Sequence, residues 1–160
     1  GVEPGVVAAL HAAAPRALHV VNADGARMRS LKAPAGHEPV MPPGATVVVA
    51  VAALDAAGKP LDEGVVFRPE LVAGAAGQAP GTTITPSTIA TVLTSDRGGR
   101  KDVPASTRFS VILNKADDEG LRAIAREVAA ELYVRGVDRV VMTAGLITDR
   151  PFIELISPAD

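Results

Sequence analysis

Residues 109–132 have the sequence FSVILNKADDEGLRAIAREVAAEL, which joins a buried strand to an amphipathic helix. The near-continuous apolar run Phe109–Leu113 is typical of a strand in a parallel sheet, where both faces are covered. Asp117 or Asp118 is suited to begin the following helix, and Gly136 to end it. Spacings of three and four residues give this helix one apolar face, made by Leu121, Ile124, Ala125, Val128 and Leu132.

Four further strands are expected around this unit. Val137–Met142 is apolar and follows the helix, and Phe152–Ile156 has the composition of a last edge strand. Thr46–Ala52 is so apolar that we expect both of its faces to be buried. Leu18–Val21 predicts the first strand of the chain, which stops at Asp24 and Gly25.

Helices are expected between these strands, because proline and capping residues stand where helices begin and end. They are Val6–Ala14, begun by Glu3 and Pro4 and ended by Pro15; a short helix over Pro69–Val72; and Ser87–Leu93, capped by Thr85 with Pro86 in its first turn. The proline-rich segment Arg27–Gly44 has no period and is predicted to be a long loop, a length that is usually functional or disordered. Ser95–Ser106 is expected to be an exposed connection with a solvated basic tip.

Alternating strands and helices predict an α/β protein with a three-layer, mostly parallel sheet flanked by helices. The length of 160 residues fits a single domain, residues 1–160. Because parallel strands end at the same edge of a sheet, the loops at Asp24, Asn114–Asp117 and Thr143–Gly145 are expected to share one rim. Ligands of open α/β sheets bind at this edge.

Composition excludes several classes of protein. The net charge of −2 argues against nucleic acid and anionic membranes as partners, since both are bound through an excess of Lys and Arg. With no cysteine, the chain has neither disulfides nor thiolate metal sites, which suits a cytoplasmic location. The longest apolar run, Ala45–Leu54, is about half as long as a membrane-spanning helix needs to be. These features leave the oligomeric state open.

The sequence NKAD at residues 114–117 is the sharpest motif, and it resembles the guanine-recognition motif NKxD of P-loop GTPases. A carboxylate at Asp117 would accept hydrogen bonds from the ring N–H and the amine of guanine, a pairing that adenine does not offer. Asn114 would support the loop, and the stem of Lys115 would lie along the base. The alternative is an ordinary capped helix start, where Asn and Asp are preferred anyway.

Asp24 follows an expected strand, so it is a candidate ligand of Mg²⁺ in the same kind of nucleotide site. The alternative is a simple turn, in which Asp and Gly are common. No GxxxxGK[ST] phosphate loop occurs in the 160 residues, and we therefore interpret the chain as the carboxyl-terminal, P-loop NTPase-like portion of a longer nucleotide-binding protein. NTP hydrolysis is expected only if the full-length protein carries an upstream P-loop, because positioning of the phosphates supplies most of phosphoryl-transfer catalysis.

Nearly the whole chain resembles the selenium-dependent hydroxylase accessory proteins, the YqeC family. The resemblance starts from VNADGARMRSLKAPAGHEPV at residues 21–40, where the family shows V-E-A-D-G, L-K-x-P and H-E-P-V. It continues through LDAAGKPL, FRPE, ITPSTIATVL and LNKAD, which begin at residues 54, 67, 84 and 113. Asn22 stands where the family usually has Glu, and the family's glycine-rich P-loop is missing. The resemblance implies a role in maturing molybdenum hydroxylases that carry labile selenium.

The loop that carries this resemblance holds further candidates. His37 and Glu38 would form a ligand pair or an acid/base pair, or His37 would only brace a proline-rich loop. Arg27, Arg29 and Lys32 would meet a phosphate or a pterin phosphate, or would simply be solvated.

Three hypotheses of function follow. The first is a maturation factor that binds GTP or ATP with Mg²⁺, Asp24 holding the metal and Asn114, Lys115 and Asp117 the base; its partner would be a molybdenum hydroxylase or its cofactor. The second is a scaffold without NTP turnover that docks a partner or cofactor through the loop at residues 27–40. The third is a domain that binds a small phosphate compound without turnover.

Overall fold

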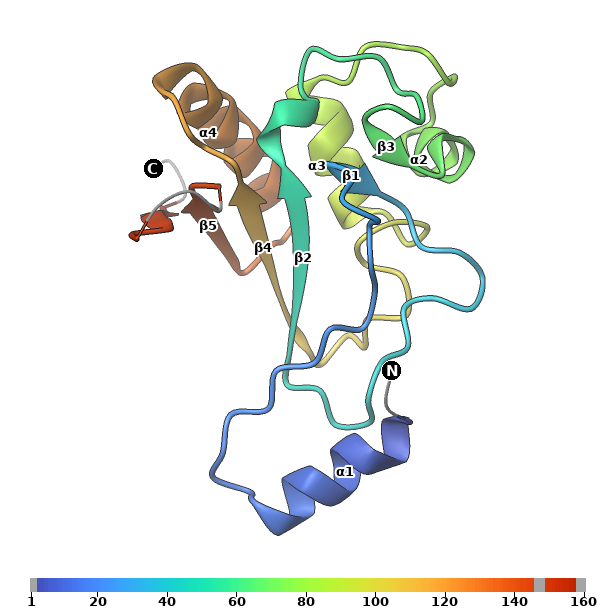
Figure 1. Cartoon of the computed structure of the whole chain (residues 1–160), viewed down its shortest axis with the longest axis vertical. Coiled ribbons are helices and arrows are strands. Elements are labelled where there is room, and N and C mark those ends of the chain that lie inside the picture. The colour runs from blue at the N-terminus through green and yellow to red at the C-terminus, as the bar shows by residue number, and fades with distance from the viewer. Residues whose placement is uncertain (1–2, 146–148, 158–160) are drawn as a thin grey trace.

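The computed structural model describes residues 3–145 and 149–157, which form an α/β arrangement with two open sheets (Figure 1). One sheet has the strand order β2-β4-β5-β6, and the other pairs β1 with β3. The strands are β1 Leu31–Lys32, β2 Val47–Ala53, β3 Val66–Phe67, β4 Arg108–Asn114, β5 Arg139–Thr143 and β6 Phe152–Ile156. The helices are α1 Pro4–Ala13, α2 Pro69–Ala76, α3 Pro86–Thr94 and α4 Glu119–Val134, with a 3₁₀ turn η1 at Leu54–Ala56.

The larger sheet is mostly parallel, as the sequence predicts. Strand β2 runs parallel to β4 with Val51 beside Ile112, and β4 runs parallel to β5 with Ile112 beside Val141. Only the edge strand β6 is antiparallel, with Leu155 beside Val141. The carboxyl ends of β2, β4 and β5 therefore lie at one edge, where the loops that follow them meet.

Helices α3 and α4 pack against each other and cover one face of this sheet. Phe109, Leu113, Met142 and Leu132 are fully buried between them and the strands. Thr85 caps α3 through a reciprocal pair of hydrogen bonds with Thr88, and Asp118 caps α4 by accepting from the Leu121 amide. The predicted helix starts are thus confirmed, with Asp118 rather than Asp117 as the cap of α4.

The opposite face of the sheet is not covered by any helix of the described residues. Val47, Val49 and Val51 of β2 are 40%, 46% and 59% exposed on it. The prediction that this strand is buried on both faces is therefore wrong, and only two of the three expected layers are present here. The run VVVAVAA is apolar at every position, so its pattern carries no information about which face is covered.

The first expected strand, Leu18–Val21, is also absent. Leu18 and Val20 are 89% and 85% exposed, and the segment has no strand partner. A strand needs a neighbour for its backbone N–H and C=O groups, and apolar composition alone does not supply one. The chain first pairs later, through Leu31 and Lys32 of β1, inside the segment expected to be loop throughout.

Helix α1 lies beyond the amino-terminal ends of β2 and β4, away from the rest of the fold (Figure 1). It occupies the expected position, with Glu3 before it and its last residue at Ala13. Most of its residues are exposed, and it makes no extensive contact with another described helix or strand. Among the described helices, none has the length and apolar character needed to cross a membrane.

The connection after α3 is packed rather than exposed at Gly98 and Gly99. The Gly99 amide donates to the Val92 carbonyl at 2.9 Å, and this close approach leaves no room for a side chain. A Cβ on Gly98 would lie 1.9 Å from the Val92 oxygen. These glycines hold the connection against the end of α3.

Replacing Gly98 with alanine should therefore lower the free energy of unfolding by about 1 to 3 kcal/mol, the usual cost of forcing atoms into a packed position. Gly36→Ala is the matched control, because a Cβ at Gly36 would meet nothing within 4 Å. Urea unfolding of the two variants measures the difference. Equal stability of both would contradict this account of the connection.

Candidate functional site

The end of β4 and the end of β5 are joined by hydrogen bonds between the loops that follow them. The Thr143 hydroxyl donates to Asn114 Oδ1 at 2.9 Å, and the Ala116 amide donates to the Thr143 carbonyl at 3.0 Å. The Gly145 amide donates to Asp117 Oδ1 at 2.6 Å. The expectation that these two loops share one rim is confirmed. We call Asn114, Lys115, Asp117, Thr143 and Gly145 the rim cluster.

Lys115 connects the rim cluster to the end of β2. Its backbone has φ 62°, a left-handed conformation that is uncommon for a residue with a side chain. Its ammonium donates to Asp55 Oδ2 at 3.0 Å and lies 3.5 Å from the Ser30 hydroxyl. Burial raises the pKa of Asp55, but the Ser30 hydroxyl and the Lys115 ammonium outweigh it and keep that pKa below its usual range.

Asp117 is exposed although it stands beside a helix start. Because Asp118 makes the cap of α4, the Asp117 carboxylate is not used for capping. Its hydrogen bond from Gly145 fixes its orientation, and a side chain at position 145 would come within 3.1 Å of Asp117 Oδ2. The rim cluster therefore presents an oriented acceptor at the edge where α/β proteins bind ligands.

A second group of charges lies around β1 and β3 and consists of Asp24, Lys32, Glu38 and Arg68; we call it the loop cluster. The Lys32 ammonium contacts the Asp24 carboxylate and also donates to Glu38 Oε2 at 2.9 Å. Arg68 donates to the same Glu38 oxygen at 2.5 Å. The side chain of Lys32 is 9% exposed, so this cation is used inside the fold.

Phe67 forms the apolar floor of the loop cluster. The guanidinium of Arg68 lies 4.6 Å from its ring centre, and the charged groups of Arg27 and Lys32 lie 5.3 and 5.4 Å from it. Cations within about 6 Å of an aromatic ring are attracted to its face. The ring thus gathers three cations, two of which, Lys32 and Arg68, also pair with Glu38.

The charge of Glu38 is strongly stabilised. The hydrogen bond from Arg68, against partial burial and with help from Lys32, lowers the pKa of Glu38 to about 2. A carboxyl with that pKa is ionised at neutral pH and makes a poor general base. The side chain of His37 is 78% exposed and its Nε2 lies 3.7 Å from Glu38 Oε1, so the predicted acid/base pair is not favoured by this geometry.

The surroundings of Asp24 do not fit a Mg²⁺ ion. Its carboxylate is paired with an ammonium group, and within the described residues no group of three or more His, Cys, Asp or Glu side chains is placed to hold a metal. Mg²⁺ at Asp24 stays a prediction, and the ion would have to displace Lys32. Arg27 and Arg29 are exposed, whereas Lys32 is neither solvated nor available to a phosphate.

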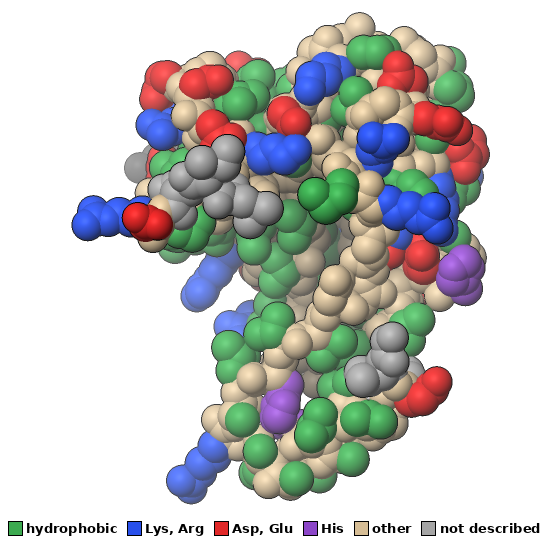
Figure 2. Space-filling model, in the orientation of Figure 1, with side chains coloured by type: hydrophobic (Ala, Val, Ile, Leu, Met, Phe, Trp, Pro, Cys, Tyr) green, Lys and Arg blue, Asp and Glu red, His purple; other side chains and the backbone are tan. Residues whose placement is uncertain are grey.

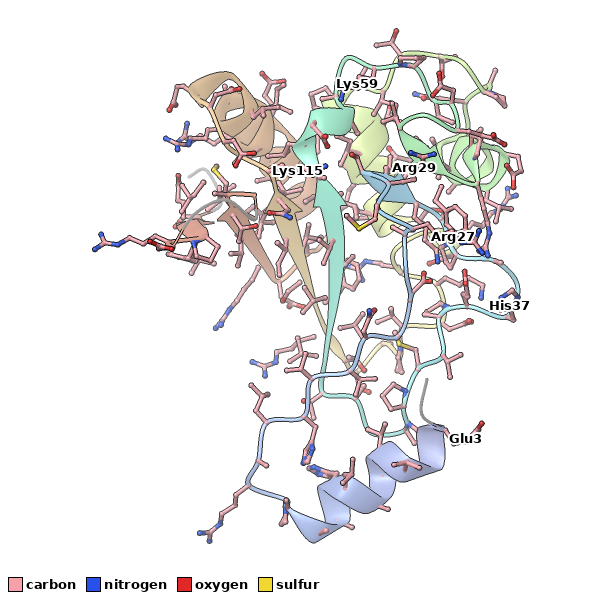
Figure 3. All side chains as sticks on the ribbon, in the orientation of Figure 1. Glu3, Arg27, Arg29, His37, Lys59 and Lys115 are labelled. Carbon is pink, nitrogen blue, oxygen red and sulfur yellow. The ribbon has the colours of Figure 1, made fainter. Side chains whose placement is uncertain are left out.

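The two clusters occupy different parts of the molecule. Figure 3 shows Lys115 at the ends of the central strands, with Arg27 and His37 well to one side. Ser30 stands between them: its carbonyl accepts from the Ala53 amide at 2.8 Å, and its hydroxyl faces Lys115. The structure therefore brings together Asn114, Lys115 and Asp117 but keeps Asp24 apart from them.

Sequence reasoning assigned no role to Asp55, Ser30, Phe67 or Arg68. Asp55 follows the expected strand Thr46–Ala52, and an acid after a strand is the same signal that makes Asp24 a candidate. Phe67 and Arg68 belong to the FRPE segment. Arg68 binds Glu38 across 30 positions of sequence, and a contact over that separation leaves no local pattern. No signal in the sequence identifies Ser30.

These features define an α/β protein with an open, mostly parallel sheet and a polar cluster at its carboxyl edge. The family model described as YqeC protein matches residues 1–70, and this part of the chain is similar to that family. The match includes the loop cluster up to Arg68 and ends before the rim cluster. No match was found among curated proteins or among solved structures.

The loop cluster should make stability depend on pH in the acid range. The pKa of Glu38 is lowered from 4.5 to about 2, so its ion pairs stabilise the fold above pH 4.5 and are lost as the pH falls toward 2. Glu38→Gln should be less stable than the unmodified protein at neutral pH and nearly equal to it near pH 2. Thermal unfolding between pH 2 and 7 measures this, with Glu127→Gln on the exposed side of α4 as the control. A Glu38→Gln deficit that does not shrink on acidification would show that Glu38 acts by packing.

Proposed function

We propose that the rim cluster binds the base of a purine nucleotide, with guanine preferred, and that the chain serves as an accessory factor in maturing selenium-dependent molybdenum hydroxylases. The second part rests on the match of residues 1–70 to the YqeC family model. The sequence resemblance implies that proteins of this family take part in maturing molybdenum hydroxylases. The first part rests on the geometry of the rim cluster. One observation carries it: Asp117 is exposed, not used as a cap, and held in place by the Gly145 amide.

The chemistry of this acceptor favours guanine over adenine. A carboxylate accepts two hydrogen bonds, and the ring N–H and exocyclic amine of guanine donate two in parallel. Adenine presents a ring acceptor at the corresponding edge and would face the carboxylate unfavourably. Asn114, held by Thr143, supports the loop on the other side of this edge.

The ion pair with Asp55 holds the Lys115 side chain at one side of the proposed base site. With its ammonium held at 3.0 Å from Asp55, the stem of Lys115 is fixed across the rim, where it would lie along the face of the base. Ribose and phosphates would extend away from the base along this edge of the sheet. In this proposal the bound nucleotide times a cofactor-insertion step, and hydrolysis requires a phosphate loop upstream.

A scaffold without turnover is the second candidate function, and the surface of the loop at residues 27–40 favours it. Met28 is 92% exposed beside the exposed Arg27 and Arg29. Met and Arg are enriched at protein interfaces. Both Arg27 and Met28 have positive φ, which is uncommon for residues with a side chain. A molybdenum hydroxylase or its cofactor is the partner that the family role implies for this loop.

Base recognition is tested by Asp117→Asn. The amide keeps one acceptor and adds a donor, so guanine faces an unmatched N–H at a cost of about 1 to 3 kcal/mol. Xanthine carries a carbonyl where guanine carries the amine and should bind better to the variant. Equilibrium titration with GTP, XTP and ATP should show weaker GTP, stronger XTP and little change in ATP.

Asp118→Asn is the matched control, because it makes the same change one residue later and Asn is as good a helix cap as Asp. Its nucleotide preference should equal that of the unmodified protein. A preference of the unmodified protein for ATP, or GTP affinity that Asp117→Asn leaves untouched, would reduce NKAD to a helix start.

A further inference from the structure

The uncovered face of the larger sheet carries an apolar row across all four strands. Val51, Ile112, Val141 and Leu155 are direct neighbours in the strand pairing and therefore point to the same side. Val51 and Leu155 are 59% and 50% exposed, and the other two are half-buried. Figure 2 shows hydrophobic side chains over this part of the sheet, between the upper body of the molecule and α1. A parallel sheet is normally covered on both faces.

Helix α1 is apolar, but no other described helix or strand packs extensively against it. Its sequence PGVVAALHAA has no Asp, Glu, Lys or Arg, and Val6 and Leu10, four residues apart on one side, are 45% and 54% exposed. Isolated helices shorter than about 12 residues are marginal in water, so a ten-residue helix of this kind needs a surface to pack on.

We propose that α1 packs on the uncovered sheet face of a second copy of this chain, in a twofold exchange of helices. The dimensions agree. Ten residues of helix span about 15 Å at 1.5 Å each. The exposed face of β2 from Val47 to Val51, along which the helix would lie, is about 13 Å long at about 3.3 Å per residue.

The charges at the two surfaces are complementary. Glu3 stands at the amino end of α1, is exposed, and points outward from the helix end (Figure 3). Arg108 and Arg139, the first residues of β4 and β5, line a hollow of about 120 Å³ at the amino ends of these strands. Asp138 lines it too, and its carboxylate accepts a hydrogen bond from the Phe109 amide. Both arginines are exposed. A helix seated with Leu10 on the row and its amino end toward this hollow would place Glu3 against them.

A second copy of the chain would cover both the apolar side of α1 and the uncovered face of the sheet. Each molecule gives one helix and one sheet face, so a twofold axis produces two equivalent contacts from four apolar surfaces. Each surface needs to lose only about 400 Å² to water for the dimer to reach the about 1,600 Å² of a standard interface. The position of α1, clear of its own sheet and on an extended linker, leaves the helix free to reach a neighbour (Figure 1).

The proposal predicts a dimer in sedimentation velocity of the 160-residue chain at micromolar concentration. Val51→Asp and Leu10→Asp should each weaken the dimer by about tenfold or more, because each puts a charge into an apolar contact. Val134→Asp is the matched control: Val134 is 90% exposed at the end of α4, outside the proposed contact, and its replacement should leave the dimer intact. A monomer at every concentration, or equal effects of all three substitutions, would overturn the proposal.

Cross-linking distinguishes packing of α1 on a second copy from packing of α1 on its own sheet. The sequence contains no cysteine, so the introduced cysteines are the only thiols in each chain. Leu10→Cys and Val51→Cys are prepared as separate proteins, mixed, and treated with a short bismaleimide. The exchange predicts a covalent dimer that joins one chain of each kind. A third protein carries both Leu10→Cys and Val51→Cys in one chain. If only this double variant is cross-linked, and the cross-link lies within a monomer, α1 covers its own sheet and the proposal is wrong.

Discussion

The parallel pairing of β4 with β5 is the constraint on which the rest of this structure depends. Their register, Ser110 beside Arg139 through Leu113 beside Met142, brings both strands to their ends at the same level. Asn114 and Thr143 are the last residues of these strands and are joined by a hydrogen bond. The next residues continue the contact, so that Gly145 orients Asp117. The proposed base site follows directly from strand register.

The loop cluster has a different physical character. Its four charged side chains pair with one another, and the hydrogen bonds from Arg68 and Lys32 lower the pKa of Glu38. Such a network fixes the path of the chain from Asp24 to Glu38 and ties it to Arg68. The fixed path in turn exposes Arg27, Met28 and Arg29. A site for docking and a site for a base can therefore coexist on one chain without sharing residues.

Much of this organisation could be predicted from the sequence where signals were local. Proline and capping residues marked the starts of α1, α3 and α4, and the NKAD strand-to-helix unit lies where expected. Predictions that depended on distant partners were wrong or incomplete. Leu18–Val21 is apolar enough for a strand but finds no neighbour, and Lys32, expected to meet phosphate or solvent, meets Asp24 and Glu38. The exposed face of β2 could not be predicted, since Val and Ala at every position suit either side.

Base binding at the rim cluster is tested most directly by backbone amide chemical shifts of isotope-labelled protein during titration with GMP and AMP. The account predicts that GMP shifts the amides of Ala116, Asp117, Ala144 and Gly145 in a saturable way, and that AMP at equal concentration shifts them far less. Amides of the loop cluster, such as that of Ala35 beside Glu38, should stay in place. Equal shifts with both nucleotides, or shifts confined to the loop cluster, would contradict a guanine site formed by Asn114 and Asp117.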